Sequence, residues 1–170
     1  MIKQLLKRLE CWPYKQLVFR HFGFLTNEYG FVIEQDESVN ICVFIASREN
    51  CILKIFVNPK ETSVLIGPTG YAKQELVDNG YNPKTIDISL IVECFEPELK
   101  QIRNWGQPYS VILEWYAHYT KKHCETMLAG DFSQWPRIQK YLSERGMMNE
   151  AMMQELANTV KSKQNNLRNS

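Results

Sequence analysis

The chain has 170 residues, with 20 Lys and Arg against 19 Asp and Glu, which gives a formal net charge of +1. Apolar residues make up 44% and charged residues 23% of the chain, and both shares are typical of a globular domain. They exclude a disordered charged tail, which would have few apolar residues and a large net charge. No run of about 18 apolar residues is present, so we expect no membrane span.

The length suits one folding unit. We expect residues 1–161 to form a single domain and the polar residues 162–170 to be a frayed tail. Charges interrupt the apolar residues of the first segment, MIKQLLKRLECWPYK, and no small-residue cleavage site follows it, so it does not resemble a secretory signal. We therefore expect a cytoplasmic protein.

The five cysteines are an odd number, and none of them forms a C-x-x-C pair. This pattern indicates neither a zinc knuckle nor a thioredoxin-type redox site. Cys42, Cys51 and Cys94 lie within apolar runs, and we expect them to be buried free thiols in a reducing compartment.

Two helices are predicted at the start of the chain. Residues 2–9 form a short amphipathic pattern, and Pro13 fits the first turn of a second helix. Apolar residues then recur every three to four positions, as a helix requires: Leu17, Val18, Phe22, Leu25 and Tyr29. Gly30 follows as a helix stop.

Four short runs of β-branched and aromatic residues come next, separated by turn-forming residues. These runs span residues 31–33, 41–45, 52–57 and 64–66. Short connections favour an antiparallel meander. The middle two runs are apolar on both faces, so we expect them to be central and covered by helices on at least one side.

The second half is predicted to be mainly helical. Residues 67–83 are rich in turn formers, and 86–95 fit a strand or a helix; we favour a helix that starts near Asp87 or Ser89. A strong helical pattern covers 109–128 and ends at Gly130.

A further helix is expected after a cap at Asp131 or Ser133, with Pro136 in its first turn and Gly146 at its end. A last helix is expected over 148–160. The predicted fold is therefore α+β, with N-terminal helices, a four-stranded antiparallel meander and C-terminal helices packed on the sheet.

The sequence offers little support for a metal or a cofactor. His118 and His123 are five positions apart, so they do not share a helix face, and no H-E-x-x-H motif is present. The GPTG segment at 67–70 lacks the pattern of a phosphate-binding loop and is better interpreted as a turn. We expect no bound metal and no cofactor.

Catalysis stays open as an alternative. No G-x-S-x-G nucleophile elbow is present, but Cys94 and His118 can meet in space. The alternative function is a small enzyme or ligand-binding domain with a pocket between the sheet and the helices. Nucleic acid is not the expected partner, because basic residues are scattered, with a doublet at Lys121 and Lys122.

The acidic residues are less evenly spread than the net charge suggests. Between Arg20 and Lys54 the only basic side chains are His21 and Arg48. Within this gap lie the acids Glu28, Glu34, Asp36 and Glu37, and Glu49 follows Arg48. Residues 86–99 contain acids and no basic residue, namely Asp87, Glu93, Glu96 and Glu98. Acidic loops of this kind can steer a basic partner toward the domain.

Two motifs carry a resemblance to a group of bacterial proteins. The motifs are FRHFGFLTNEYGF at 19–31 and WYAHYTKKHCETMLAGDFSQWPRIQKYL at 115–142. They resemble segments of small immunity proteins that are encoded beside polymorphic or contact-dependent growth inhibition toxins. The resemblance implies a short antiparallel meander followed by helices, and it carries no catalytic residues.

The resemblance also implies a function. The chain would bind a cognate toxin domain and neutralise it without catalysis of its own. The residues that we expect to contact the toxin are the acids of the turn-rich segments: Glu34, Asp36, Glu37, Glu96 and Glu98.

Overall fold

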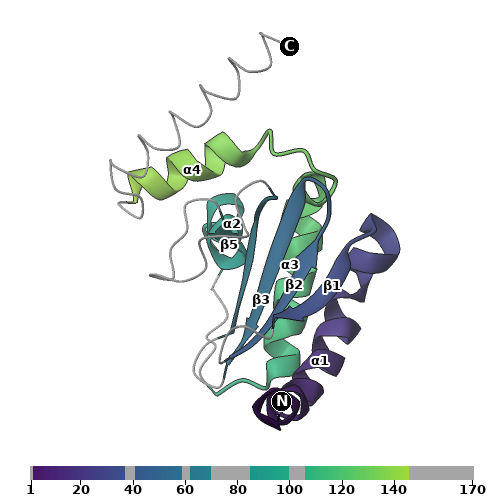
Figure 1. Cartoon of the computed structure of the whole chain (residues 1–170). Helices are drawn as coiled ribbons and strands as arrows, with labels where there is room; N and C mark the ends of the chain where they lie inside the picture. The colour runs from purple at the N-terminus through teal and green to yellow at the C-terminus, as the bar shows by residue number, and fades with distance from the viewer. Residues whose placement is uncertain (1, 37–40, 59–61, 70–84, 100–105, 146–170) are drawn as a thin grey trace. The chain divides into compact units, whose positions relative to one another are not determined.

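The computed structural model describes residues 2–36, 41–58, 62–69, 85–99 and 106–145. In chain order its elements are α1 (Ile2–Tyr29), β1 (Val32–Asp36), β2 (Cys42–Ser47), β3 (Cys51–Val57), β4 (Thr62–Pro68), β5 (Ile86–Asp87), α2 (Ile88–Phe95), α3 (Tyr109–Leu128) and α4 (Trp135–Glu144) (Figure 1). The chain divides into two compact units, Met1–Phe132 and Ser133–Ser170, which are described one at a time.

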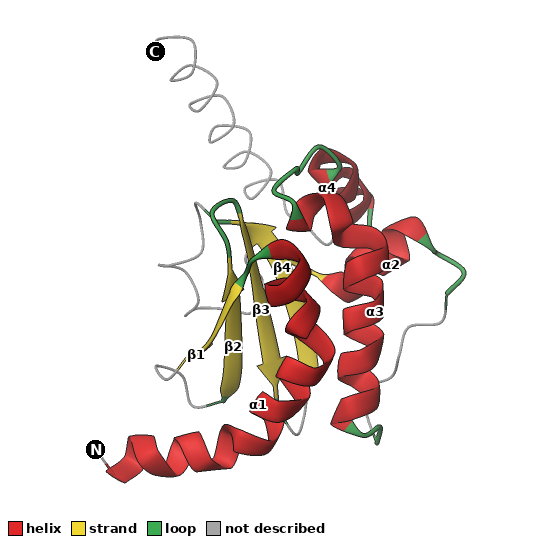
Figure 2. Cartoon of the chain, turned by 90° about the vertical axis from the view of Figure 1, so that its right-hand side faces the viewer, coloured by secondary structure: helices red, strands yellow, loops and turns green. Residues whose placement is uncertain are grey.

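The first helix is continuous where the sequence predicts two. α1 includes both 2–9 and the segment that starts at Pro13, with the proline inside it. Proline removes one helical hydrogen bond and bends a helix, and Figure 2 shows α1 bending along its length. Gly30 ends α1 as predicted. Its φ is 71°, and the Phe31 amide donates to the Leu25 carbonyl at 3.0 Å.

The strands form an antiparallel meander in the order β1-β2-β3-β4-β5. With helices packed on this sheet, the predicted α+β fold is confirmed. The predicted sheet lacks β5, because its two residues, Ile86 and Asp87, are too few to show an alternating pattern. The predicted helix in 86–95 is confirmed as α2, and its N-cap is Asp87, whose side chain accepts a bond from the Ser89 amide at 2.7 Å.

Side chains alternate between two faces of the sheet, which we call inner and outer. The inner face contains Cys42 and packs against α1 and α3, which lie side by side (Figure 2). Its buried side chains are Phe44, Ala46, Leu53, Ile55, Val64 and Ile66, and the helices add Phe22, Leu25, Ile112 and Leu113. As predicted, β2 and β3 are central and covered by helices on one side.

The end of α3 is fixed against the turn between β2 and β3. Gly130 reverses the chain with a φ of 92°, a conformation that favours glycine. A Cβ at this position would lie 3.1 Å from the Cβ of Asn50. The Arg48 guanidinium donates to the Leu128 carbonyl at 3.3 Å. Gly130 therefore has the structural role that the sequence predicts for it.

The second unit contains α4, which confirms the helix predicted after Gly130. Its N-cap is Gln134, without a side-chain cap, so the predicted cap at Asp131 or Ser133 is wrong, and Pro136 lies in the first turn as expected. Arg145 donates to the Tyr141 hydroxyl at 2.7 Å. The predicted helix over 148–160 and the predicted tail lie outside the described residues.

A disulfide joins α1 to the central strand β2. The sulfur atoms of Cys11 and Cys42 are 1.98 Å apart, and their Cα atoms are 5.6 Å apart. The prediction that Cys42 is a free thiol is therefore wrong, because the fold brings together two cysteines that are 31 positions apart in the sequence. Cys51 is a buried free thiol as expected, whereas Cys94, which forms no disulfide, is only partly buried.

None of the described helices combines the length and the hydrophobicity that crossing a bilayer requires.

Reducing the Cys11–Cys42 bond is expected to destabilise the protein. A cross-link over a sequence separation of 31 stabilises a fold by about 3–4 kcal/mol, mainly by restricting the unfolded chain. Urea unfolding with and without a reductant measures this difference. The control is a Cys11→Ala/Cys42→Ala variant, whose unfolding should not respond to the reductant. Equal stability of the oxidised and reduced wild-type protein would contradict the prediction.

Candidate binding surface

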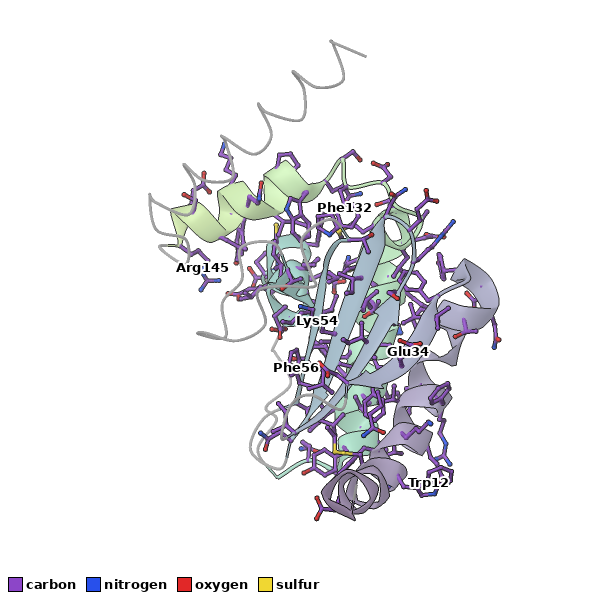
Figure 3. The ribbon with its side chains drawn as sticks, viewed as in Figure 1. Trp12, Glu34, Lys54, Phe56, Phe132 and Arg145 are labelled. Carbon is purple, nitrogen blue, oxygen red and sulfur yellow. A yellow bond between two sulfur atoms is a disulfide. The ribbon has the colours of Figure 1, made fainter. Side chains whose placement is uncertain are left out.

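The outer face of the sheet is turned away from α1 and α3 (Figure 2). The strand register places these side chains on it: Val32, Glu34 and Asp36 of β1, Val43 and Ile45 of β2, Ile52, Lys54 and Phe56 of β3, and Leu65 of β4. Figure 3 shows Glu34, Lys54 and Phe56 on the face toward the viewer. Val32 is 59% exposed, and Ile45, Phe56 and Leu65 are half-buried. Val43, Ile52 and Lys54 on the same face are buried, so Val32, at the β1 margin, is the exposed apolar side chain among these residues.

Two of the predicted contact acids lie at the margin of this face. Glu34 is exposed and Asp36 is half-buried, both on β1, and β1 forms one edge of the sheet. Their partners in the register are Ile45 and Val43 of β2. Glu37, the third predicted acid of this segment, lies outside the described residues.

Lys54 occupies the centre of the outer face, in register with Ile45 on one side and Leu65 on the other. It is only 1% exposed. Burial lowers the pKa of its ammonium group, and the negative charge of Asp36 partly offsets this effect. A buried lysine with a perturbed pKa is typical of a functional surface as well as of structural charge networks. Lys54 was not among the residues predicted from the sequence, although a lysine inside the run ILKIFV is a visible signal.

The other two predicted acids lie on a different part of the molecule. Glu96 and Glu98 follow α2, which comes directly after β5, the edge strand opposite β1. Glu96 forms an ion pair with Lys122 and a 2.7 Å hydrogen bond with His123 of α3. The bond from Lys122, more than any other contact, lowers the pKa of the Glu96 carboxyl. Glu98 is exposed. The five predicted acids therefore do not form one surface.

The alternative function is a small enzyme or ligand-binding domain, and His123 is the residue whose contacts fit it best. Its ring stacks on Phe95 at 5.4 Å and on Tyr119 at 5.9 Å, with interplanar angles of 6° and 13°. Together with the bond to Glu96 this gives a histidine–carboxylate pair, which can orient a histidine for proton transfer. His118 is exposed one turn before His123 and contacts the Tyr119 ring.

Two of the free thiols are poor nucleophiles. Burial raises the pKa of Cys51 to about 12, and it raises the pKa of Cys124 further above the ordinary thiol value. Both therefore stay protonated at neutral pH, and a thiol attacks as the thiolate.

The basic doublet on α3 is paired with acids. Lys121 forms a 2.6 Å ion pair with Glu28 of α1, and Lys122 pairs with Glu96. These contacts reduce the positive charge that the doublet can offer to a phosphate backbone. Lys100 and Arg103, two further basic residues that a nucleic-acid-binding face could include, lie outside the described residues.

Within the described ranges, no three His, Cys, Asp or Glu side chains are close enough to hold a metal ion. No protein-family model matches the chain, and neither a curated protein nor a solved structure is significantly similar to it.

Replacing Lys54 by methionine is expected to stabilise the protein by about 1–2 kcal/mol at neutral pH. Methionine keeps the apolar stem and removes a charge that the folded state desolvates. The pKa of Lys54 is lower in the folded state than its ordinary value of 10.5. The unfolded chain therefore binds more protons just below that pH, and wild-type stability rises there with pH.

Urea unfolding of wild type and Lys54→Met at about pH 7 and about pH 10 tests this, because the advantage of the variant should shrink at the higher pH. Lys54→Ala is the matched control, since it also removes the stem and should destabilise the fold by about 2–3 kcal/mol. A Lys54→Met protein that is less stable than wild type at neutral pH would contradict this prediction. It would show that the Lys54 charge stabilises the folded state.

Proposed function

We propose that this chain is an immunity protein, which binds a cognate bacterial toxin domain through the outer face of its sheet and blocks it without catalysis of its own. The observation that carries the proposal is the outer face itself. It combines the exposed Val32 and the half-buried Phe56 with the acids Glu34 and Asp36 at one edge. Apolar side chains beside charged ones at the margin are a common feature of protein–protein interfaces.

The charge of this edge favours a basic partner. Glu34 and Asp36 lie two positions apart on one face of β1, so their charges act on the same side of the sheet. Complementary charge accelerates association and excludes wrong partners. A toxin with a basic substrate-binding surface fits this requirement, and a standard interface of this kind buries about 1,600 Å² in total.

The motifs that carry the resemblance have mainly structural roles in this fold. Phe22, Leu25 and Phe31 of the first motif are buried, and Gly30 makes the turn into β1. In the second motif Gly130 turns the chain after α3. Since these residues pack the fold, the resemblance supports a shared architecture and leaves the binding surface to other residues.

The second candidate is a small enzyme or ligand-binding domain. The observation in its favour is the bond between His123 and Glu96 at 2.7 Å. In this candidate His123 transfers a proton, whereas in the first it only packs α2 against α3. The two candidates therefore differ in what the His123 ring is needed for.

Reversing the charge of the two acids of β1, Glu34 and Asp36, is expected to weaken toxin binding. The immunity function predicts that the adjacent reading frame encodes the toxin domain. Titration calorimetry of that product with Glu34→Lys/Asp36→Lys should give a Kd at least about tenfold higher than with wild type. The matched control is Glu114→Lys, which reverses the charge of an exposed acid on α3. This control variant should bind the toxin domain like wild type.

His123→Gln is a further arm of this experiment, and it should bind the toxin and protect cells as wild type does. Normal binding without protection by this variant would favour the enzyme. Absence of any binding between the wild-type protein and the toxin domain would refute the immunity function.

The compartment is a separate part of the proposal. A toxin that acts inside the cell requires its inhibitor in the cytoplasm, whereas the Cys11–Cys42 disulfide is a bond that oxidising compartments maintain. If the protein is cytoplasmic, an alkylating reagent added during lysis should modify Cys11 and Cys42, as resolved by mass spectrometry of the peptides. Recovery of the intact disulfide from cells would place the protein in an oxidising compartment instead.

A further inference from the structure

The outer edge of β1 is open to a further strand. The sheet order gives β1 a single neighbour among the described strands, β2. Figure 2 looks onto this edge, with β1 in front of β2 and α1 to one side. An edge strand has backbone N–H and C=O groups without a partner strand, and these can pair with another chain.

The hydrogen bonds of the neighbouring turn identify which backbone groups point outward. The Arg48 amide donates to the Cys51 carbonyl at 2.9 Å, next to the register pair of Ser47 and Ile52. Because bonded pairs alternate along an antiparallel ladder, the even-numbered residues of β2 bond to β3. Its odd-numbered residues therefore direct their backbone groups toward β1.

The register extends this assignment to β1. The odd-numbered residues of β2 are paired with Val32, Glu34 and Asp36, so these three residues use their backbone groups within the sheet. Ile33 and Gln35 then direct their N–H and C=O groups away from β2. Two residues of β1 thus offer a complete set of donors and acceptors to an added strand.

The side chains of β1 restrict pairing at this edge by charge, because Glu34 and Asp36 disfavour an acidic or apolar strand. Natural edge strands are commonly blocked by proline or lysine, and β1, with the sequence VIEQD, has neither. Its outer-face side chains are instead apolar at Val32 and acidic at Glu34 and Asp36. Directly opposite residues of paired strands interact, and opposite charges stabilise the pair.

From this edge we infer the binding mode of the partner: a segment of the toxin adds as a strand along β1, with Lys or Arg side chains opposite Glu34 and Asp36. This inference rests on the proposed immunity function and specifies the chemistry of its interface. The backbone groups of Ile33 and Gln35 provide the affinity, and the two acids select a basic segment, as in other cases of strand addition.

The test removes the outward backbone N–H of Gln35 and leaves the hydrogen bonds between β1 and β2 intact. Gln35→Pro lacks the amide donor but breaks no bond to β2, and edge strands tolerate proline at such a position. Gln35→Ala is the matched control, because it loses the same side chain and keeps the N–H. Titration calorimetry against the toxin domain should give Gln35→Pro a Kd at least about tenfold above that of Gln35→Ala, which should bind like wild type.

Hydrogen exchange of the wild-type protein provides a second measurement that does not depend on a variant. The amides of Ile33 and Gln35 should exchange rapidly in the free protein and at least about tenfold more slowly in the toxin complex. Wild-type affinity of Gln35→Pro, together with unchanged exchange at these amides in a complex that forms, would overturn strand addition and leave the immunity function standing.

Two other outcomes also overturn the inference. Failure of the wild-type protein to bind the toxin refutes the immunity function and strand addition with it. Slow exchange of Ile33 and Gln35 in the free protein, together with a dimer mass in sedimentation, would assign the edge to a second copy of this chain.

Discussion

The register of β2, β3 and β4 is the constraint on which the rest of the structure depends. It places Phe44, Leu53 and Ile66 on the inner face, where α1 and α3 cover them. A shift of one residue would turn Lys54 toward the helices and Leu53 away from them, at the cost of the core. The same register therefore fixes the outer face, including the side on which Glu34 lies, and the disulfide at Cys42 fixes α1 against the inner face.

Local patterns were sufficient to predict most of the fold. The four apolar runs predicted the strands, and Gly30 and Gly130 marked two helix ends because both positions need a left-handed φ. Other features depend on tertiary structure and left no local signal. Pro13 stays inside α1, although proline is also common at helix starts. The Cys11–Cys42 bond depends on how α1 packs on β2, which cysteine spacing does not encode.

The surface was less predictable than the fold for the same reason. Acids from two segments of the chain were predicted to contact one partner, but the sheet places Glu34 at one edge and Glu96 beyond the other. Glu96 is bonded to His123, which is 27 positions away, so its role depends on how α2 packs on α3. Lys54 interrupts an apolar run in the sequence, but its burial becomes evident only once β3 is known to be an interior strand. A binding surface is a property of the assembled sheet, and composition alone does not define it.

The central claim is that the outer face and the β1 edge bind the partner. The most direct measurement is a chemical-shift map of the isotope-labelled protein titrated with the toxin domain. The account predicts the largest changes in β1 and in the outer-face residues Ile45 and Phe56, with little change in α3. The largest changes around His123, or around Trp12, which is 56% exposed on α1, would contradict it.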